Sequence, residues 1–159
     1  MLAVAKPLRT LCAGDLMSRN VVMVPQEMSV EGAARMLSQA QISGAPVVDG
    51  EGRCIGVISA TDFVHWAENG RRPKDGDPAC VCQPWQILED HGFPDGVVRS
   101  LMTADPVTAA PVTPIATLAR MMLDAHIHRV IVVDRNRRPV GVVSSTDILA
   151  AMAQSAQAD

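Results

Sequence analysis

Two short segments of the chain carry hydroxyl and carboxyl side chains in the same order. "GVISATD" spans residues 56–62, and "GVVSSTD" spans residues 141–147, which lie 85 positions later. In each segment an apolar run ends in a serine, and an aspartate follows three residues after it. This is the spacing of a capping box at the start of a helix. The first amides of a helix also attract phosphate, and a carboxylate there can accept two hydrogen bonds from a ribose diol.

Two interpretations of these segments are open. In the structural one, the serine and aspartate satisfy the first amides of a helix, and the carboxylate faces the positive end of the helix dipole. In the functional one, the same groups bind a sugar phosphate, and Gly56 and Gly141 let a ligand approach the backbone closely. The spacing alone does not choose between them. The candidate residues are Ser59, Thr61 and Asp62 in the first segment and Ser144, Thr146 and Asp147 in the second.

Both segments belong to an internal repeat. A shift of 85 positions aligns the sequence with itself over roughly fifty residues without a gap. The matching pieces are Leu16-Met17 with Leu101-Met102, Ala34-Arg35-Met36 with Ala119-Arg120-Met121, and Val47-Val48-Asp49 with Val132-Val133-Asp134. We therefore predict two tandem copies at residues 13–67 and 98–152, separated by an insertion or linker at residues 68–97.

Each copy predicts the element order β-α-β-β-α. An amphipathic helix follows a short apolar stretch, because apolar residues recur with the i, i+3, i+4, i+7 spacing. The stripes are Val30, Ala33, Ala34 and Leu37 in the first copy and Ile115, Leu118, Ala119 and Met122 in the second. Ser29 and Thr113 are the expected N-caps, with Pro114 in the first helical turn. Two β-branched runs and a second helix, from Thr61 or Thr146, complete each copy.

The composition limits the classes of function. The chain has 159 residues, of which 48% are hydrophobic, and its net charge is −3. This balance predicts a globular α/β protein and gives no electrostatic reason to bind nucleic acid or an anionic membrane. There are two Trp, two Phe and no Tyr, so a flat ligand must lie among aliphatic side chains. We expect neither a signal peptide nor a membrane span, and hence a cytoplasmic location with reduced cysteines.

Other patterns are weaker. Thiolates bind zinc, but Cys80-Val-Cys82 has no second cysteine pair, so we predict no metal site and retain Cys80 and Cys82 only as weak candidates. The sequence contains no phosphate-binding loop with the GxxxxGK[ST] pattern, no GxSxG elbow and no HExxH motif. We therefore expect no enzyme activity and no required cofactor.

Taken together, the duplicated "G-h-h-S-x-[ST]-D" junctions (h, apolar) and the strands "ISGAPVVD" and "IHRVIVVD" resemble a tandem pair of cystathionine-β-synthase (CBS) domains, a Bateman module. The resemblance covers about two-thirds of the chain. It implies two repeats packed about a pseudo-twofold axis, with clefts that hold AMP, ADP or ATP, and less readily S-adenosylmethionine. It assigns Asp62 and Asp147 to the ribose hydroxyls, and Ser59, Thr61, Ser144 and Thr146 to ribose or phosphate.

The resemblance also implies that the two copies differ. Nucleotide-binding members of the family place a phosphate-contacting His-Arg pair where this chain has His128 and Arg129, and the first copy has Ser43 and Gly44 there. The implied function is a regulatory sensor of adenine nucleotides. The resemblance further implies a homodimer that acts on an effector protein, which the sequence does not identify. The alternative is a ligand-free interaction module whose working surface is the insertion, with a metal at its cysteines.

Overall fold

The computed structural model describes residues 6–70 and 95–156, which form two compact units. Within these ranges, unit 1 contains residues 6–21, 52–54 and 106–156, and unit 2 contains residues 22–51, 55–70 and 95–105. Each unit is an α/β assembly with its own sheet and its own buried core. The predicted α/β class is confirmed.

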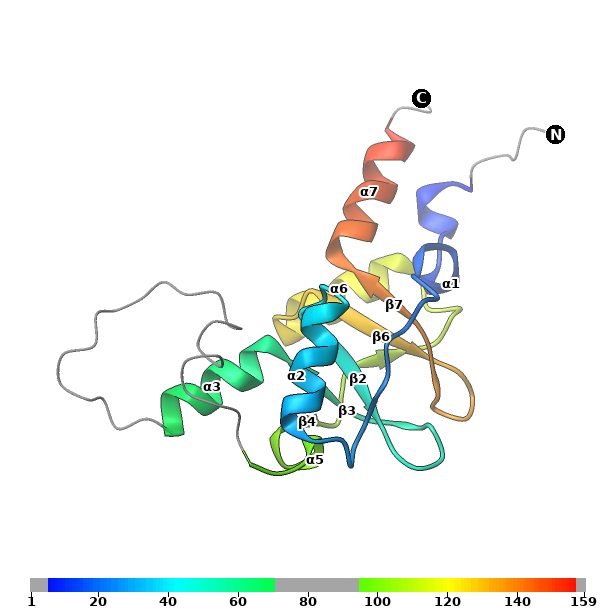
Figure 1. The fold of residues 1–159 in the computed structure, drawn as a ribbon. Coiled ribbons are helices and arrows are strands. Elements are labelled where there is room, and N and C mark those ends of the chain that lie inside the picture. Colours follow the sequence, from blue (N-terminus) through cyan, green and yellow to red (C-terminus); the bar gives the residue numbers. More distant parts are fainter. Residues whose placement is uncertain (1–5, 71–94, 157–159) are drawn as a thin grey trace, which may run out of the picture. The chain divides into compact units, whose positions relative to one another are not determined.

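Unit 2 contains most of the first repeat (Figure 1). Its sheet has the strand order β1-β2-β3-β4, in which β1 and β2 are parallel and β3 and β4 are antiparallel. Because β1 and β2 are parallel, the chain crosses over between them through a helix. The elements are β1 (Val24–Pro25), α2 (Val30–Gln39), β2 (Gly44–Val48), β3 (Cys54–Ser59), α3 (Ala60–Gly70), α5 (Val98–Leu101) and β4 (Thr103–Ala104).

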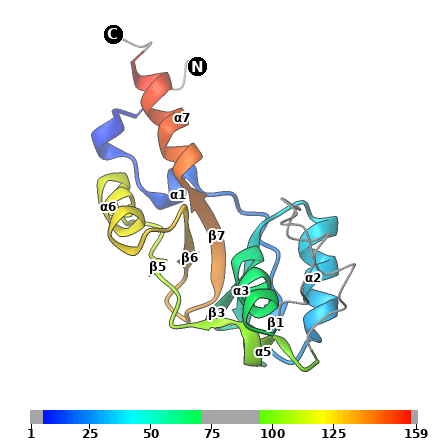
Figure 2. The same ribbon diagram turned by 90° about the vertical axis from the view of Figure 1, so that its left-hand side faces the viewer.

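Unit 1 contains most of the second repeat (Figure 2). Its sheet has the order β5-β6-β7, with β5 parallel to β6 and β6 antiparallel to β7. Helix α6 packs on β6, and α7 packs on β7 and on α6. The elements are η1 (Leu8–Thr10), α1 (Ala13–Leu16), β5 (Thr108–Ala109), α6 (Ile115–Ala125), β6 (Arg129–Val133), β7 (Pro139–Ser144) and α7 (Ser145–Ser155).

The predicted helix stripes form the cores. All four stripe residues of α2 are buried, and on α6 Ala119 is half-buried while the other three are buried. Ser29 is the N-cap of α2, and its hydroxyl accepts from the Gly32 amide, as predicted. The N-cap prediction for α6 is wrong by one residue. Pro114 occupies the cap position, and the hydroxyl of Thr113 accepts from the Ala110 amide in the preceding turn instead.

The leading segment of each repeat packs in the unit of the other repeat. Residues 13–21 belong to unit 1 with the second repeat, and residues 98–105 belong to unit 2 with the first. In unit 2, β4 pairs with β3 and places Thr103 opposite Val57. In unit 1, Ser18 pairs with Val142 at the corresponding positions. A compact unit therefore combines segments from both sequence repeats.

This exchange gives Gly56 and Gly141 a structural role. A Cβ on Gly141 would lie 2.4 Å from Sδ and 2.8 Å from Cβ of Met17. A Cβ on Gly56 would lie 2.6 Å from Sδ of Met102 and 2.8 Å from the Thr103 carbonyl oxygen. The interpretation that these glycines admit a ligand is wrong, because a methionine of the leading segment fills the space over each one.

Several of the sequence predictions can be compared with the described residues. No helix in residues 6–70 and 95–156 is long and apolar enough to cross a membrane. Within the same ranges, no three His, Cys, Asp or Glu side chains gather in a way that could hold a metal ion. Of the predicted insertion, residues 68–70 extend α3, whereas Cys80 and Cys82 lie outside the described residues.

The contact between Met17 and Gly141 predicts a specific loss of stability. Replacing Gly141 with Ala should lower the free energy of unfolding by about 1–3 kcal/mol, because the new methyl group overlaps Met17 in a closely packed site. Urea denaturation measures the difference. The matched control is Gly50→Ala, whose Cβ would meet nothing within 4 Å and should change stability by about 0.5 kcal/mol or less. Equal effects of the two substitutions would contradict this packing.

Candidate functional site

The second junction is built by hydrogen bonds at the start of α7. Oδ2 of Asp147 accepts from the Ser144 amide at 2.7 Å and from the Ser144 hydroxyl at 2.8 Å. In return, Oγ of Ser144 accepts from the Asp147 amide at 3.1 Å. The capping box expected from the sequence is therefore present. It fixes the position of the carboxylate at the end of β7, where both side chains are half-buried.

Strand β6 brings the predicted basic pair to the same junction. The register of β6 and β7 places Arg129 opposite Ser144, and the Ser145 amide donates to the His128 carbonyl at 2.9 Å. Side chains of residues directly opposite in an antiparallel pair lie on the same face of the sheet. His128, Arg129 and Thr146 are exposed to solvent. The structure therefore gathers all five predicted residues of the second copy around one strand-to-helix turn.

The first junction has the same carboxylate cap with an additional donor. Oδ2 of Asp62 accepts from the Ser59 amide at 2.7 Å and from the Ser59 hydroxyl at 3.1 Å. Oδ1 of Asp62 accepts from the Thr103 hydroxyl at 3.1 Å. Within residues 6–70 and 95–156, Oδ1 of Asp147 accepts no hydrogen bond. The two aspartates thus differ in whether Oδ1 accepts a hydrogen bond from the protein.

The first copy also has no basic pair beside its junction. The Ala60 amide donates to the Ser43 carbonyl at 2.8 Å, which repeats the backbone contact of the second copy. Gly44 occupies the position of Arg129, and a Cβ there would lie 3.2 Å from Cβ of Ser59. The backbone of the two junctions is therefore alike, while the positive side chains are present at the second junction alone among the described residues.

Sequence reasoning missed Thr103 and its counterpart Ser18. Both follow the aligned Leu-Met pairs, so the 85-residue offset that revealed the repeat also matches these two hydroxyl residues. What the offset could not reveal is that Thr103 belongs to the unit of the other repeat and hydrogen-bonds Asp62 there. Contacts made by exchanged segments do not appear in the periodicity of either copy.

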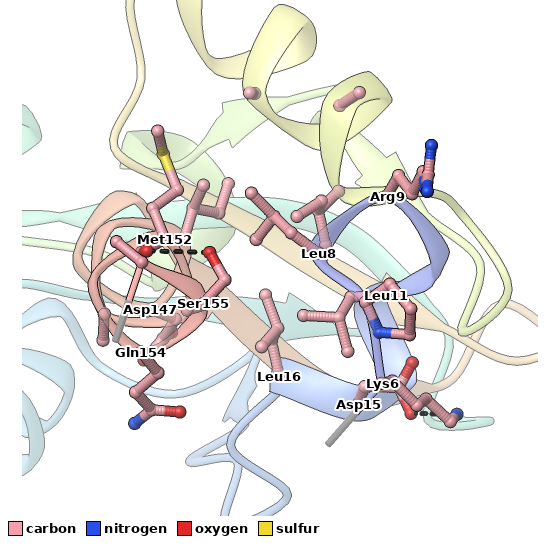
Figure 3. Close-up of a pocket in the computed structure, with 18 residues that line it drawn as sticks. Lys6, Leu8, Arg9, Leu11, Asp15, Leu16, Asp147, Met152, Gln154 and Ser155 are labelled. Carbon is pink, nitrogen blue, oxygen red and sulfur yellow. Dashed lines mark hydrogen bonds and ion pairs between the residues drawn. The ribbon is translucent and has the colours of Figure 1, made fainter. Parts of the chain in front are cut away.

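A pocket of about 1080 Å³ opens on the helical side of unit 1 (Figure 3). Its walls come from the segment containing η1 and α1 and from α6 and α7. Asp147 lines this pocket, whereas His128 and Arg129 do not. Most of the lining is aliphatic, and the other charged lining residues are Lys6, Arg9 and Asp15.

An ion pair links Lys6 to Asp15 within the segment that forms one wall of this pocket. Nζ of Lys6 lies 2.6 Å from Oδ1 of Asp15. The hydrogen bond from Lys6, followed by those from the Cys12 amide and thiol, holds the pKa of Asp15 well below its usual range. The same bond raises the pKa of Lys6. Both side chains are at the surface, so salt screens their attraction.

The lowered pKa of Asp15 predicts a dependence of the N-terminal segment on pH. The stabilising contribution of Asp15 is present above its unfolded-state pKa of about 3.9 and is lost as the pH falls through its lower folded-state pKa. Replacing Lys6 with Gln removes the largest cause of the shift, so the loss should begin at a higher pH than in the wild type. Hydrogen-exchange protection of the Ala13 and Gly14 amides, which donate to Thr113 and Pro111, reports this release.

The result should depend on ionic strength because the pair is exposed. In high salt, the acid profiles of the wild type and of Lys6→Gln should converge. Profiles that coincide already at low salt would contradict a contribution of the ion pair.

Comparison with known proteins decides the family. A model of the CBS domain matches residues 13–69 and again residues 98–154. The chain belongs to the CBS domain family. The two matches correspond to two copies in tandem, so the chain contains a CBS domain pair, and each junction aspartate lies within one match.

Solved CBS structures share this fold. The CBS domain pair of protein MJ0100, in complex with 5-methylthioadenosine and S-adenosyl-L-methionine, superimposes with a TM-score of 0.71 at 23% identity over 91% of this chain and 98% of that one. CBSX2 in complex with AMP gives 0.69 at 24% identity, over 90% and 96%. The CBS domain of a CBS domain-containing membrane protein from Sphaerobacter thermophilus gives 0.67 at 28% identity, over 91% and 89%.

Curated relatives are mostly much longer proteins. CBSX2, a chloroplastic CBS domain-containing protein of Arabidopsis thaliana, is 27% identical over 89% of this chain, which spans 63% of its length. An inosine-5'-monophosphate dehydrogenase of Halobacterium salinarum is 29% identical, but this chain spans 21% of it. For a homoserine O-acetyltransferase of Methanohalobium evestigatum the identity is 24% and the share is 22%. The shared part is the CBS pair, and the enzyme names do not carry over to it.

Proposed function

We propose that this CBS domain pair is a non-catalytic regulatory module that binds an adenine nucleotide, AMP, ADP or ATP, at the second junction. One observation carries the proposal: Arg129 lies opposite Ser144, at the turn where Asp147 is fixed by its capping box. In this proposal Asp147 accepts hydrogen bonds from the ribose hydroxyls. Ser144 and Thr146 contact ribose or phosphate, and His128 and Arg129 bind phosphate, for which the guanidinium fork is well suited.

The bound ligands named for two related structures support an adenosine-type ligand. The MJ0100 pair was crystallised with 5-methylthioadenosine and S-adenosyl-L-methionine, and CBSX2 with AMP. The basic pair beside Asp147 favours a ligand with phosphate groups over S-adenosylmethionine, whose sulfonium is positive. Regulation requires only that the ligand bind one conformation of the module better than another. The shift in conformation that the ligand causes is passed to a partner protein or to a second copy of the chain, in the cytoplasm.

A ligand-free interaction module is the alternative function. Under this alternative the carboxylate cap at α3 and the capping box at α7 serve only to start these helices, and the working surface is the segment between the repeats. The basic pair argues against it. A capping box needs no arginine on the neighbouring strand, and the first copy forms its cap with Gly44 at that position.

Calorimetric titration with AMP, ADP, ATP and S-adenosylmethionine tests the proposed function. We expect saturable binding of at least one adenine nucleotide, reduced tenfold or more in Asp147→Asn. The asparagine oxygen can still accept the capping hydrogen bonds, but the charge that holds two ribose hydroxyls is lost. Arg129→Ala should weaken ATP binding tenfold or more and adenosine binding little, because only ATP has phosphates.

The same titration separates the two functions. A control variant is Arg120→Ala, an exposed arginine on α6 that does not line the pocket beside Asp147, which should bind ATP like the wild type. Absence of binding by all four compounds, in a protein shown to be folded by circular dichroism, would exclude the sensor function and leave the interaction module.

We also propose that the chain forms a homodimer through the helices of unit 1. Five of the six large hydrophobic side chains that are exposed among the described residues belong to this unit. Leu149 and Met152 are one helical turn apart on α7, and Leu123 lies on α6, which packs against α7. Apolar side chains gathered on adjacent helices are typical of a surface that a partner covers.

Size-exclusion chromatography with light scattering tests the dimer. We expect the wild type to be dimeric and the double variant Leu149→Glu, Met152→Glu to be monomeric at the same concentration, because two charges would be buried at the contact. The matched control is Met23→Glu, which changes an exposed methionine of unit 2 and should leave the dimer intact. A monomeric wild type, or dissociation by the Met23 variant as well, would contradict this interface.

A further inference from the structure

The most informative difference between the two junctions is the hydrogen bond from Thr103 to Asp62. Oδ2 of Asp62 already accepts from the amide and hydroxyl of Ser59, and the Thr103 hydroxyl occupies Oδ1 at 3.1 Å. The carboxylate is therefore engaged through both oxygens by groups of the protein. A ribose diol binds a carboxylate by donating two hydroxyl hydrogens. At Asp62, Oδ1 has room for only one of these hydroxyls while Thr103 is bound, so both can bind only if the threonine is displaced.

The second junction has the same backbone without this contact. Ser18 stands at the position that corresponds to Thr103, and its backbone makes the same pairing, with Val142 in place of Val57. Its amide donates to the Val142 carbonyl at 2.9 Å, and its carbonyl accepts from the Val142 amide at 3.0 Å. Yet no hydrogen bond joins its hydroxyl to Asp147 in the described part of the chain. Among the described residues, therefore, none occupies Oδ1 of Asp147.

The difference between threonine and serine explains this asymmetry. The methyl group of threonine restricts rotation about χ1, so its hydroxyl is held in one direction when the backbone is fixed in a strand. Thr103 lies in β4 and is fixed by its pairing with Val57. The serine hydroxyl rotates more freely and is not held on the carboxylate. A hydrogen bond to a charged acceptor contributes more than one between neutral groups, so Thr103 is a real competitor for a ribose hydroxyl.

We infer that Thr103 closes the first junction against ribose, so that the chain binds one adenosine ligand, at the Asp147 junction. The inference rests on the proposed function, because it specifies which of the two carboxylates the ligand reaches. It assigns Thr103 as the residue that determines whether a ligand occupies the Asp62 junction. The two repeats then have different tasks: the second binds the ligand, and the first starts its helix with a carboxylate that already accepts three hydrogen bonds from its own unit.

Binding stoichiometry of AMP to the full chain, measured by calorimetry and equilibrium dialysis, tests this inference. The wild type should bind one AMP per chain. Thr103→Val keeps the shape of the side chain but removes the donor, and should add a second, weaker site. The second site should disappear again in the double variant Thr103→Val, Asp62→Asn. Loss of the second AMP site in the double variant would show that this site uses the Asp62 carboxylate, from which the valine has removed the threonine hydroxyl.

Reciprocal substitutions at Ser18 provide the matched controls. Ser18→Thr introduces the restricted hydroxyl beside Asp147 and should weaken AMP binding about fivefold, the value of one hydrogen bond. Ser18→Ala removes a hydroxyl at the same backbone position and should leave one site of unchanged affinity. A general disturbance of the leading segments would instead affect all variants alike.

The outcomes separate the inference from the function on which it rests. Two AMP molecules per wild-type chain, or a single site in Thr103→Val, would overturn the role of Thr103 and leave adenosine binding established. No binding of AMP to the wild type or to any variant would overturn both. One site in the wild type, two in Thr103→Val and one again in the double variant support both.

Discussion

The serine–aspartate hydrogen bonds at the two strand-to-helix turns are the constraint on which the rest of the protein depends. They satisfy amides at the beginning of α3 and α7, and thereby fix where each helix starts after its strand. A capping box uses one carboxylate oxygen for this purpose and leaves the other available. The same two side chains can therefore start a helix and contact a ligand, and the structural and functional interpretations of the motif do not exclude one another.

What distinguishes the two turns lies in neighbouring strands. At the second turn β6 and the residue before it contribute Arg129 and His128, and the leading segment contributes Ser18, which forms no hydrogen bond to the carboxylate among the described residues. At the first turn β2 contributes Gly44, and β4 contributes a threonine that does. The first difference places positive side chains beside the second turn, and the second leaves the two aspartates with different numbers of accepted hydrogen bonds. The repeat is conserved in backbone while it differs in charge and hydrogen bonding, and a duplicated fold need not have duplicated activity.

Much of this architecture could be predicted from the sequence, because the fold depends on local patterns. The helix stripes, the Ser29 cap and the capping box at Ser144 follow from residue spacing within one element. The cap of α6 was misplaced by one residue because Thr113 and Pro114 both suit a helix start. The exchange of the leading segments was not predictable, since residue spacing does not reveal which strand a segment joins. The methionines over Gly56 and Gly141 and the Thr103 contact follow from that exchange.

The exchanged leading segments also determine what can be separated in this protein. A fragment cut at the repeat boundary, beginning at residue 98, would leave Gly141 without Met17 above it and Val142 without its backbone partner Ser18. It would also retain β4, whose own partner strand stays behind in the other fragment. A single repeat is thus a unit of sequence but not of folding. A fusion that carries this module into a longer protein would keep these strand contacts only if both copies were transferred together.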